Sequence, residues 1–459
     1  MTWTMVSRQL PEPPPTRRAT DQLTRRESDM PAGPSRTGRP HRRTDDGWLD
    51  RWMETVSDLA RLKNSHPMLD AVIQEQVGRR IRIGERWLSD FASCNYLGFD
   101  LDEEIIASIP GYIAEWGTHP SWSRLLGSPR LYEEIEEQMA DLLACEDVLL
   151  FATITHIHTS VIPVLAGEGV IFMDGRAHKT IYDGCAYARA HGATLKRFRH
   201  DDVDHLSDLL AASDPSQPRL IVMDGVNSMT GNAPNVPAFA ELAREHDALL
   251  YVDDAHGFGV IGERSRDELC DYGTKGNSVM RHLDAPYDNV ILVAGFSKAY
   301  SSLLAFLALP TKLKDVLKVL APPYLYSGPS PIASLATTLT GLEVNRTRGD
   351  AIRLELWRKT HRVLGALEDL GIYTPNESGY PIIEIPLARH EEIDEVGRYL
   401  FDHGIYATLA AYPLVPKNEV GFRIQTTAAN TDEQIEDLIS VLGSLREHFQ
   451  LQTAERDAI

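Results

Sequence analysis

Apolar residues occur in four short runs in the middle of the chain, and each run ends in polar side chains. β-Branched and aliphatic residues dominate the runs, and short continuous runs of this kind are typical of strands buried on both faces. The sequence therefore predicts four buried strands whose ends carry the polar groups. The runs cover residues 170–173, 220–223, 248–252 and 290–293.

Other segments show the spacing of amphipathic helices. One begins at Trp48 and continues to Leu62, and another covers residues 131–145, where acidic side chains crowd the exposed start and complement the helix dipole. The Thr-Asp-Glu-Gln sequence at 431–434 is a capping box that predicts the last helix. Residues 1–47 are rich in Pro, Arg, Thr and Asp and lack apolar periodicity, so we expect a disordered tail there.

The residues that follow the four runs carry the candidate chemistry. Lys298 lies just past the last run, where partial desolvation lowers a lysine's pKa and suits it to form a Schiff base; a surface lysine opening a helix is the alternative. Asp253 is costly to bury unless it meets a cation, such as a protonated pyridine nitrogen. Because ligands of open α/β sheets bind at this edge, we expect one crevice to contain these two side chains together with His178, Ser228 and His256.

The composition excludes several classes of function. The chain has 459 residues and a formal net charge of −20, which argues against nucleic acid or an anionic membrane as the main partner. No apolar run approaches the roughly 20 residues that a membrane helix needs. The four cysteines lack metal-like spacing, and His156 and His158 have no evident third ligand. We expect a cytoplasmic protein with reduced thiols and no metal.

The order of these pieces resembles the α-oxoamine synthases, a family of fold-type I enzymes that use pyridoxal 5′-phosphate (PLP). The similarity covers roughly residues 91–442 and is strongest at 178–185 and 197–200. It implies an α/β fold in which a large PLP-binding domain with a mostly parallel central sheet precedes a smaller α+β C-terminal domain. The expected parts after the tail are residues 48–105 (an N-terminal helix and strand segment), 106–339 (the large domain) and 340–459 (the small domain).

The resemblance also implies roles around the cofactor ring. Lys298 would hold PLP as a Schiff base, and Asp253 would keep the ring nitrogen protonated so that the ring can accept electrons. His178 would stack on the ring, with a purely structural histidine as the alternative. His256 would hydrogen-bond the phenolic oxygen, which Ser228 would also approach. The residues that we expect to act in catalysis are Lys298, His178, Asp253 and His256.

The cofactor phosphate is expected at the start of a helix, where backbone N–H groups bind anions. The expected contacts are Thr153, Thr155, His156 and Ser297. Ile154 stands where relatives have a glycine, so the local backbone should differ from theirs. Ser327 lies in a segment that resembles one reaching across a dimer to the partner's phosphate. This resemblance implies a homodimer with a composite active site.

Substrate contacts implied by the resemblance are Asn95, Ser123 and Arg423. Arg423 could bind an amino-acid carboxylate through two parallel hydrogen bonds. Asn95 would contact the same carboxylate, with an edge strand that turns at Gly98 as the alternative. Relatives carry a further arginine where this chain has Ala411, and a glycine-rich stretch where it has residues 301–306. We therefore expect a reshaped acceptor site.

The leading hypothesis for function is a PLP-dependent acyltransferase. It would condense an amino acid with an acyl thioester, carried by coenzyme A or a carrier protein, and release CO2 to give an α-aminoketone. One alternative is an aminotransferase or decarboxylase that uses the same cofactor. Another is a non-catalytic partner subunit, against which the retention of Lys298 and Asp253 argues.

Overall fold

The computed structural model describes residues 47, 51, 63, 66–412 and 414–453. Residues 53–459 form one compact unit, and only residues 47 and 51 are described in the other unit, residues 1–52. Apart from these single positions, the predicted tail and the helix predicted from Trp48 to Leu62 lie outside the described residues. None of the helices in the described part is long and apolar enough to cross a membrane.

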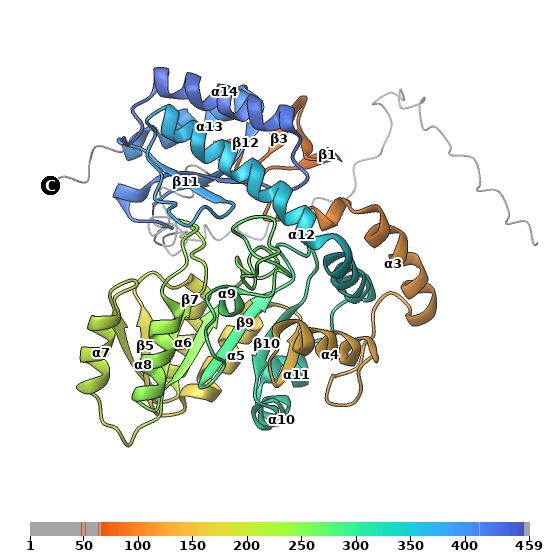
Figure 1. The fold of residues 1–459 in the computed structure, drawn as a ribbon, viewed down its shortest axis with the longest axis vertical. Helices are drawn as coiled ribbons and strands as arrows, with labels where there is room; N and C mark the ends of the chain where they lie inside the picture. The colour runs from red at the N-terminus through yellow and green to blue at the C-terminus, as the bar shows by residue number, and fades with distance from the viewer. Residues whose placement is uncertain (1–46, 48–50, 52–62, 64–65, 413, 454–459) are drawn as a thin grey trace, which may run out of the picture. The chain divides into compact units, whose positions relative to one another are not determined.

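A seven-stranded sheet contains the four predicted strands (Figure 1). Its strands, in spatial order, are β4 (Asp147–Phe151), β10 (Ala305–Leu309), β9 (Val290–Gly295), β8 (Leu249–Asp253), β7 (Arg219–Asp224), β5 (Val170–Asp174) and β6 (Thr194–Phe198). β10 runs antiparallel to β4 and β9, and the pairs from β9 to β6 are parallel. The mostly parallel central sheet of a fold-type I enzyme is thus confirmed.

Helices cover both faces of this sheet, which is why its strands are continuous apolar runs. Successive side chains point to opposite faces. Tyr251 and Val293 belong to the core that contains α5 and α6, whereas Val252 and Leu292 belong to the core that contains α4 and α8. The helices around the sheet are α4 (Leu131–Leu143), α5 (Ile154–Ala166), α6 (Lys179–Ala190), α7 (Val203–Ala211), α8 (Val236–Glu245), α9 (Val279–His282), α10 (Thr311–Leu320) and α11 (Pro322–Tyr326). The helix predicted at 131–145 ends at Leu143, because Ala144 adopts the left-handed conformation with a φ of 52°.

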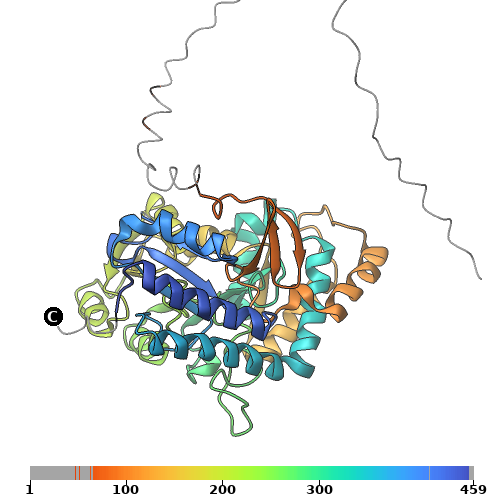
Figure 2. The same cartoon turned by 90° about the horizontal axis from the view of Figure 1, so that it is seen from above.

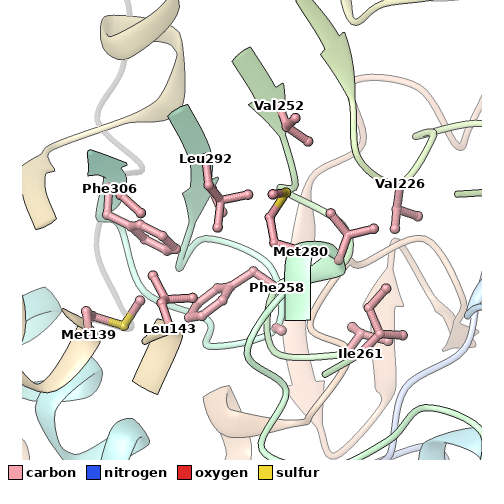
Figure 3. Packing of buried hydrophobic residues seen from close by; sticks show 14 of the residues in the cluster. Met139, Leu143, Val226, Val252, Phe258, Ile261, Met280, Leu292 and Phe306 are labelled. Atoms are coloured by element: carbon pink, nitrogen blue, oxygen red, sulfur yellow. The ribbon is translucent and has the colours of Figure 1, made fainter. Parts of the chain in front are cut away.

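One aromatic side chain ties two strand ends together. The buried ring of Phe258, in the loop after β8, lies 4.8 Å from the ring of Phe306 and 5.1 Å from that of Tyr300. Figure 3 shows Phe258 packed among Leu292, Phe306 and other apolar side chains. Tyr300 follows Lys298 by two residues, so this packing holds the loop after β8 against the segment after β9.

A second core lies between two smaller sheets and the C-terminal helices. The N-terminal strands join the C-terminal part of the chain, because β3 pairs in parallel with β12 (Figure 2). β3 lies between β2 and β12, so it is not the edge strand considered for this segment. The sheets contain β1 (Ile73–Val77), β2 (Arg80–Ile83), β3 (Arg86–Asp90) and β12 (Ile405–Tyr406), and β11 (Ile382–Pro386), β14 (Gly421–Gln425) and β13 (Thr408–Ala410).

A helix of 38 residues, α12 (Ile332–Asp369), connects the two cores. Its first half contributes Leu335 and Leu342 to the core of the seven-stranded sheet, and its end contributes Val363 and Leu367 to the second core. The boundary expected at 339/340 falls inside α12, and the domain limits stay a prediction. The remaining elements are η1 (Phe99–Leu101), α3 (Glu103–Trp116), η2 (His390–Glu392), α13 (Ile393–Asp402), η3 (Lys417–Glu419) and α14 (Asp432–His448).

The last helix, α14, begins as the sequence predicts. The Thr431 hydroxyl accepts the backbone N–H of Gln434, and the Gln434 side chain accepts the backbone N–H of Thr431. The predicted capping box is therefore confirmed.

Candidate active site

The carboxyl ends of β5, β7, β8 and β9 meet around a small crevice. The structure brings together five of the residues singled out in the sequence: Lys298, Asp253, His256, His178 and Ser228. The full lining is Ile154, His178, Asp224, Val226, Ser228, Asp253, Ala255, His256 and Lys298.

Asp253 ends β8 and is 6% exposed. Its Oδ2 lies 3.0 Å from Nε2 of His158, and its Oδ1 accepts the backbone N–H of Ala255 at 3.0 Å. Burial acts to raise the pKa of Asp253, but the hydrogen bond and charge of His158, with Lys298 and His178, lower it on balance. Asp253 is therefore an anion at neutral pH, ready to pair with a cation.

Lys298 faces Asp253 in the crevice. Burial lowers the pKa of the Lys298 amine, and the nearby charge of Asp253 opposes this shift without cancelling it. A larger fraction of the amine is thus neutral at a given pH. A neutral amine is both the nucleophile that forms a Schiff base and a base that can accept a proton.

His256 is oriented by Tyr96, a residue that the sequence analysis did not select. The Tyr96 hydroxyl lies 2.8 Å from Nδ1 of His256. Burial raises the pKa of Tyr96 and lowers that of His256, so the phenol keeps its proton and the imidazole is neutral. The phenol then donates to Nδ1, which leaves the proton of the ring on Nε2. The sequence motif instead favours the neighbouring Asn95, with Tyr96 beside it.

Asp224 is a second carboxyl group that the sequence analysis did not select. It lies beside Asp253 in the register of β7 and β8. Its Oδ1 accepts the backbone N–H of His178 at 3.1 Å, and its Oδ2 is buried without a hydrogen-bond partner. The His178 ring is exposed at the rim of the crevice, with Nδ1 2.8 Å from the Thr180 hydroxyl. Asp224 thus fixes the backbone that carries His178.

The helix start expected to bind phosphate is present at α5. Thr153 is its N-cap in an extended conformation, and its hydroxyl accepts the backbone N–H of His156 at 3.3 Å. Ile154 is the first helical residue and lines the crevice, so a helix begins here without a glycine. Thr155 is exposed, and the His156 side chain lines a neighbouring hollow with Ser327 instead of the crevice.

Three further expected contacts, Ser297, Ser123 and Ser327, also do not line the crevice within this chain. Ser297 is exposed next to Lys298. The Ser123 hydroxyl donates to the backbone oxygen of Leu325 at 2.6 Å, which ties the loop before α4 to α11. Ser327 lies in the hollow that contains His156. Their binding roles, like that of the half-buried Asn95, stay predictions.

Arg423 lies on β14 and reaches the edge of the crevice. Its Nη1 donates to the backbone oxygen of Ser228, and its Nη2 and Nε donate to the Gln425 amide oxygen at 2.7 and 3.0 Å. Glu384 pairs with Arg423 in the register of β11 and β14. Ala411 is buried and brings no guanidinium group, so Arg423 stands without the second arginine of the relatives.

Glu384 is an unforeseen buried carboxyl group in this region. It is 2% exposed, and its Oε1 has no hydrogen-bond partner. Burial, with a smaller contribution from Glu419, raises its pKa to about 7, although Arg176 and Arg423 oppose the shift. No sequence pattern marked Glu384, because it occupies an apolar strand whose side chains are otherwise core residues.

The residues of the crevice fit PLP. Asp253 supplies an ionised carboxylate for a protonated ring nitrogen, and Lys298 supplies an amine for the aldehyde. Nε2–H of His256 can donate to a phenolic oxygen, and the first turn of α5 offers backbone donors for a phosphate. Across the described chain, no group of three or more His, Cys, Asp or Glu side chains could hold a metal ion.

Comparison with known proteins gives one consistent family. The model of the family "Aminotransferase class I and II" matches residues 116–442. An 8-amino-7-oxononanoate synthase of Alkalilimnicola ehrlichii is 34% identical over 369 residues, which cover 77% of this chain and 87% of that protein. A serine palmitoyltransferase of Sphingobacterium spiritivorum is 30% identical over 80% of this chain and 88% of its own length.

Solved structures share the fold. Serine palmitoyltransferase from S. paucimobilis, with a bound PLP–myriocin aldimine, matches with a TM-score of 0.79 at 22% identity, over 87% of this chain and 98% of that one. An 8-amino-7-oxononanoate synthase from Francisella tularensis matches with a TM-score of 0.65 at 20% identity, over 79% of this chain and 98% of that one.

We predict that the Glu384→Gln substitution stabilises the protein more as the pH rises. The folded-state pKa of Glu384 is raised from 4.5 to about 7. Between these values the unfolded chain loses the proton that the folded chain keeps, so the free energy of unfolding of the wild type falls with pH. The variant lacks this loss. Its free energy of unfolding should therefore rise by about 3 kcal/mol relative to that of the wild type across this pH range, because one pKa unit is worth about 1.4 kcal/mol.

Urea unfolding of both proteins at about pH 4.5 and about pH 8 measures this difference. The matched control is Glu395→Gln, which removes an exposed carboxylate and should follow the wild type at both pH values. Equal pH dependence for Glu384→Gln and the wild type would contradict a proton held by Glu384.

Proposed function

The chain belongs to the α-oxoamine synthases, within the aminotransferase class I and II family of PLP enzymes, and we propose that it condenses an amino acid with an acyl thioester. The reaction forms a carbon–carbon bond, releases CO2 and the free thiol, and leaves an α-aminoketone. The observation that carries this proposal is the placement of Lys298 and Asp253 in one crevice, with an anionic carboxylate and an amine of lowered pKa.

PLP, when bound, delocalises the negative charge that develops on the amino acid's α-carbon. Asp253 would hold the ring nitrogen by charge and hydrogen bond. His256 would donate Nε2–H to the phenolic oxygen, because Tyr96 occupies the other nitrogen of the imidazole. Ser228 lines the same crevice, and His178, at its rim, would cover the cofactor ring.

Lys298 has two tasks. Its amine holds the cofactor before the amino acid arrives, and it then removes the proton from the α-carbon as a general base. The lowered pKa serves both tasks, since only the neutral amine can form the bond or accept the proton. Asp253 lies near the ammonium that results and offsets its charge.

Arg423 is the residue that we propose for the substrate carboxylate, with Asn95 assisting. The contacts of Arg423 with Ser228 and Gln425 hold its guanidinium group at the edge of the crevice. Ala411 supplies no second guanidinium, so less positive charge faces the amino acid than in the relatives. Phosphate contacts are proposed for Thr153, Thr155, His156 and Ser297.

We also propose a homodimer whose partner completes the site with Ser327. Large apolar side chains are exposed on neighbouring segments, and Leu126 and Tyr326 are more than four-fifths exposed. The hydrogen bond from Ser123 to Leu325 holds the two segments together, so these side chains form one exposed apolar region with Trp122 and Leu125. Such regions mark interaction sites.

Sedimentation should give twice the mass of the chain, and Leu126→Asp should shift the protein toward monomer. A monomeric wild type would contradict the dimer.

We place the protein in the cytoplasm on the strength of its thiols. The four cysteines, Cys94, Cys145, Cys185 and Cys270, are all free in the structure. Reduced cysteines are typical of the cytosol.

The test of function is the release of labelled CO2. Purified protein with PLP is given glycine, alanine or serine labelled in the carboxyl group, with and without acyl-coenzyme A thioesters of two to sixteen carbons. We expect CO2 release that requires the thioester and falls at least about a thousandfold in Lys298→Ala, because the proton acceptor is lost. The control variant, Lys312→Ala, removes an exposed lysine and should keep full activity. Keto-acid formation without a thioester would contradict condensation and indicate transamination.

A further inference from the structure

A buried histidine lies behind Asp253, and the reaction proposed above does not use it. His158 is on α5 and is fully buried. Its Nε2 lies 3.0 Å from Oδ2 of Asp253, and its Nδ1 lies 2.8 Å from the hydroxyl of Tyr251. Tyr251, His158 and Asp253 therefore form a continuous hydrogen-bonded chain that ends in the crevice.

The fold holds these three hydrogen-bonded side chains in place from both sides. Tyr251 and Asp253 are two residues apart on β8, so they point to the same face of the sheet, which α5 covers. α6 packs against the backbone of His158 so closely that a Cβ on Gly184 would lie 2.3 Å from the His158 carbonyl oxygen. This close approach holds the His158 backbone against α6, and the His158 ring contacts the two side chains on β8.

Proton positions follow from the partners. Burial raises the pKa of Tyr251 well above its usual value, so Tyr251 keeps its hydroxyl proton. The hydroxyl donates to Nδ1 of His158, which places the ring proton on Nε2, where it points to Asp253. In this arrangement the Nε2–H of His158 stabilises the Asp253 anion by a hydrogen bond.

The neighbouring carboxyl group shows what happens without such a donor. Asp224 lies beside Asp253 in the sheet, is nearly as buried, and has a backbone N–H bond on only one oxygen. Burial and the charge of Asp253 raise the pKa of Asp224 well above its usual value, whereas the pKa of Asp253 is lowered. Lys298 lies near both carboxyl groups, whereas the side-chain hydrogen bond with an imidazole is made by Asp253 and not by Asp224.

We propose that His158 is a positioning residue that keeps Asp253 ionised and aimed at the cofactor ring nitrogen, with Tyr251 setting its tautomer. This inference rests on the proposed function for the identity of the cofactor. His158 does not touch the reacting atoms. Its effect is exerted through Asp253, whose charged and titratable neighbours are His158, Lys298, His178, Asp224, Asp254 and Tyr251.

The test compares PLP binding and ring protonation in the wild type and in His158→Phe, His158→Gln and Tyr251→Phe. PLP labelled with ¹⁵N in the ring reports by NMR whether its nitrogen is protonated. We expect His158→Phe to bind PLP about tenfold to a hundredfold more weakly, the range that holds when a contact orienting a metal ligand is lost. Its ¹⁵N signal should move toward that of the unprotonated ring, because Asp253 without its donor takes up the proton.

His158→Gln should recover most of the affinity, since its amide N–H can donate to Asp253. Tyr251→Phe should weaken PLP binding and shift the ¹⁵N signal in the same direction as His158→Phe, by a smaller amount. Because this substitution keeps an aromatic ring at position 251, it serves as the test if His158→Phe fails to fold. The control is His282→Gln, which removes a buried imidazole that binds the Gly262 carbonyl outside the crevice and should leave the ¹⁵N signal unchanged. The inference would be overturned if His158→Phe and Tyr251→Phe both kept the affinity and the ¹⁵N signal of the wild type. If His158→Phe is unfolded, wild-type values in Tyr251→Phe alone would overturn it. Neither readout needs an amino acid or a thioester, so a failure of the proposed condensation would be seen separately.

Discussion

A carboxylate buried at the end of a β-strand needs a donor on one side and a cation on the other, and this requirement organises the active site around Asp253. His158 and the Ala255 backbone supply the donors. The ring nitrogen of PLP is the cation that we propose for the other side. Lys298 is near enough to lower the pKa of Asp253. We propose that the Asp253 anion favours the protonated form of the ring. The Lys298 amine stays partly neutral because burial lowers its pKa.

The parallel sheet brings these groups together, and packing behind the sheet gives them their charge states. β7 and β8 set Asp224 and Asp253 side by side, and α5 brings His158 to only one of them. The hydrogen bond from this helix is thus one of the contacts that lower the pKa of Asp253, while burial and the charge of Asp253 raise the pKa of Asp224. The stacking of Phe258 on Tyr300 joins the loop after β8 to the segment after Lys298, so the aspartate and the lysine keep their relative placement.

Sequence reasoning could predict the parts of the site that follow from periodicity and strand ends. The apolar runs marked four strands of the central sheet, and Lys298, Asp253, His256, His178 and Ser228 all line one crevice. It could not predict contacts made across the fold. Tyr96, Asp224 and His158 act through partners that are 46 to 160 residues distant in the chain, so no local spacing reveals them. Glu384 was missed because a glutamate on a buried strand gives no pattern at all.

The central claim is that Lys298 forms the covalent bond to PLP in this crevice. The most direct measurement is borohydride reduction of the purified protein with PLP, followed by proteolysis and mass spectrometry of the peptides. Reduction makes the bond permanent, so the modified residue can be identified. The account predicts a phosphopyridoxyl group on Lys298, in near-stoichiometric yield and absent after substitution of that lysine. A modification spread over exposed lysines, with Lys298 unmodified, would contradict it.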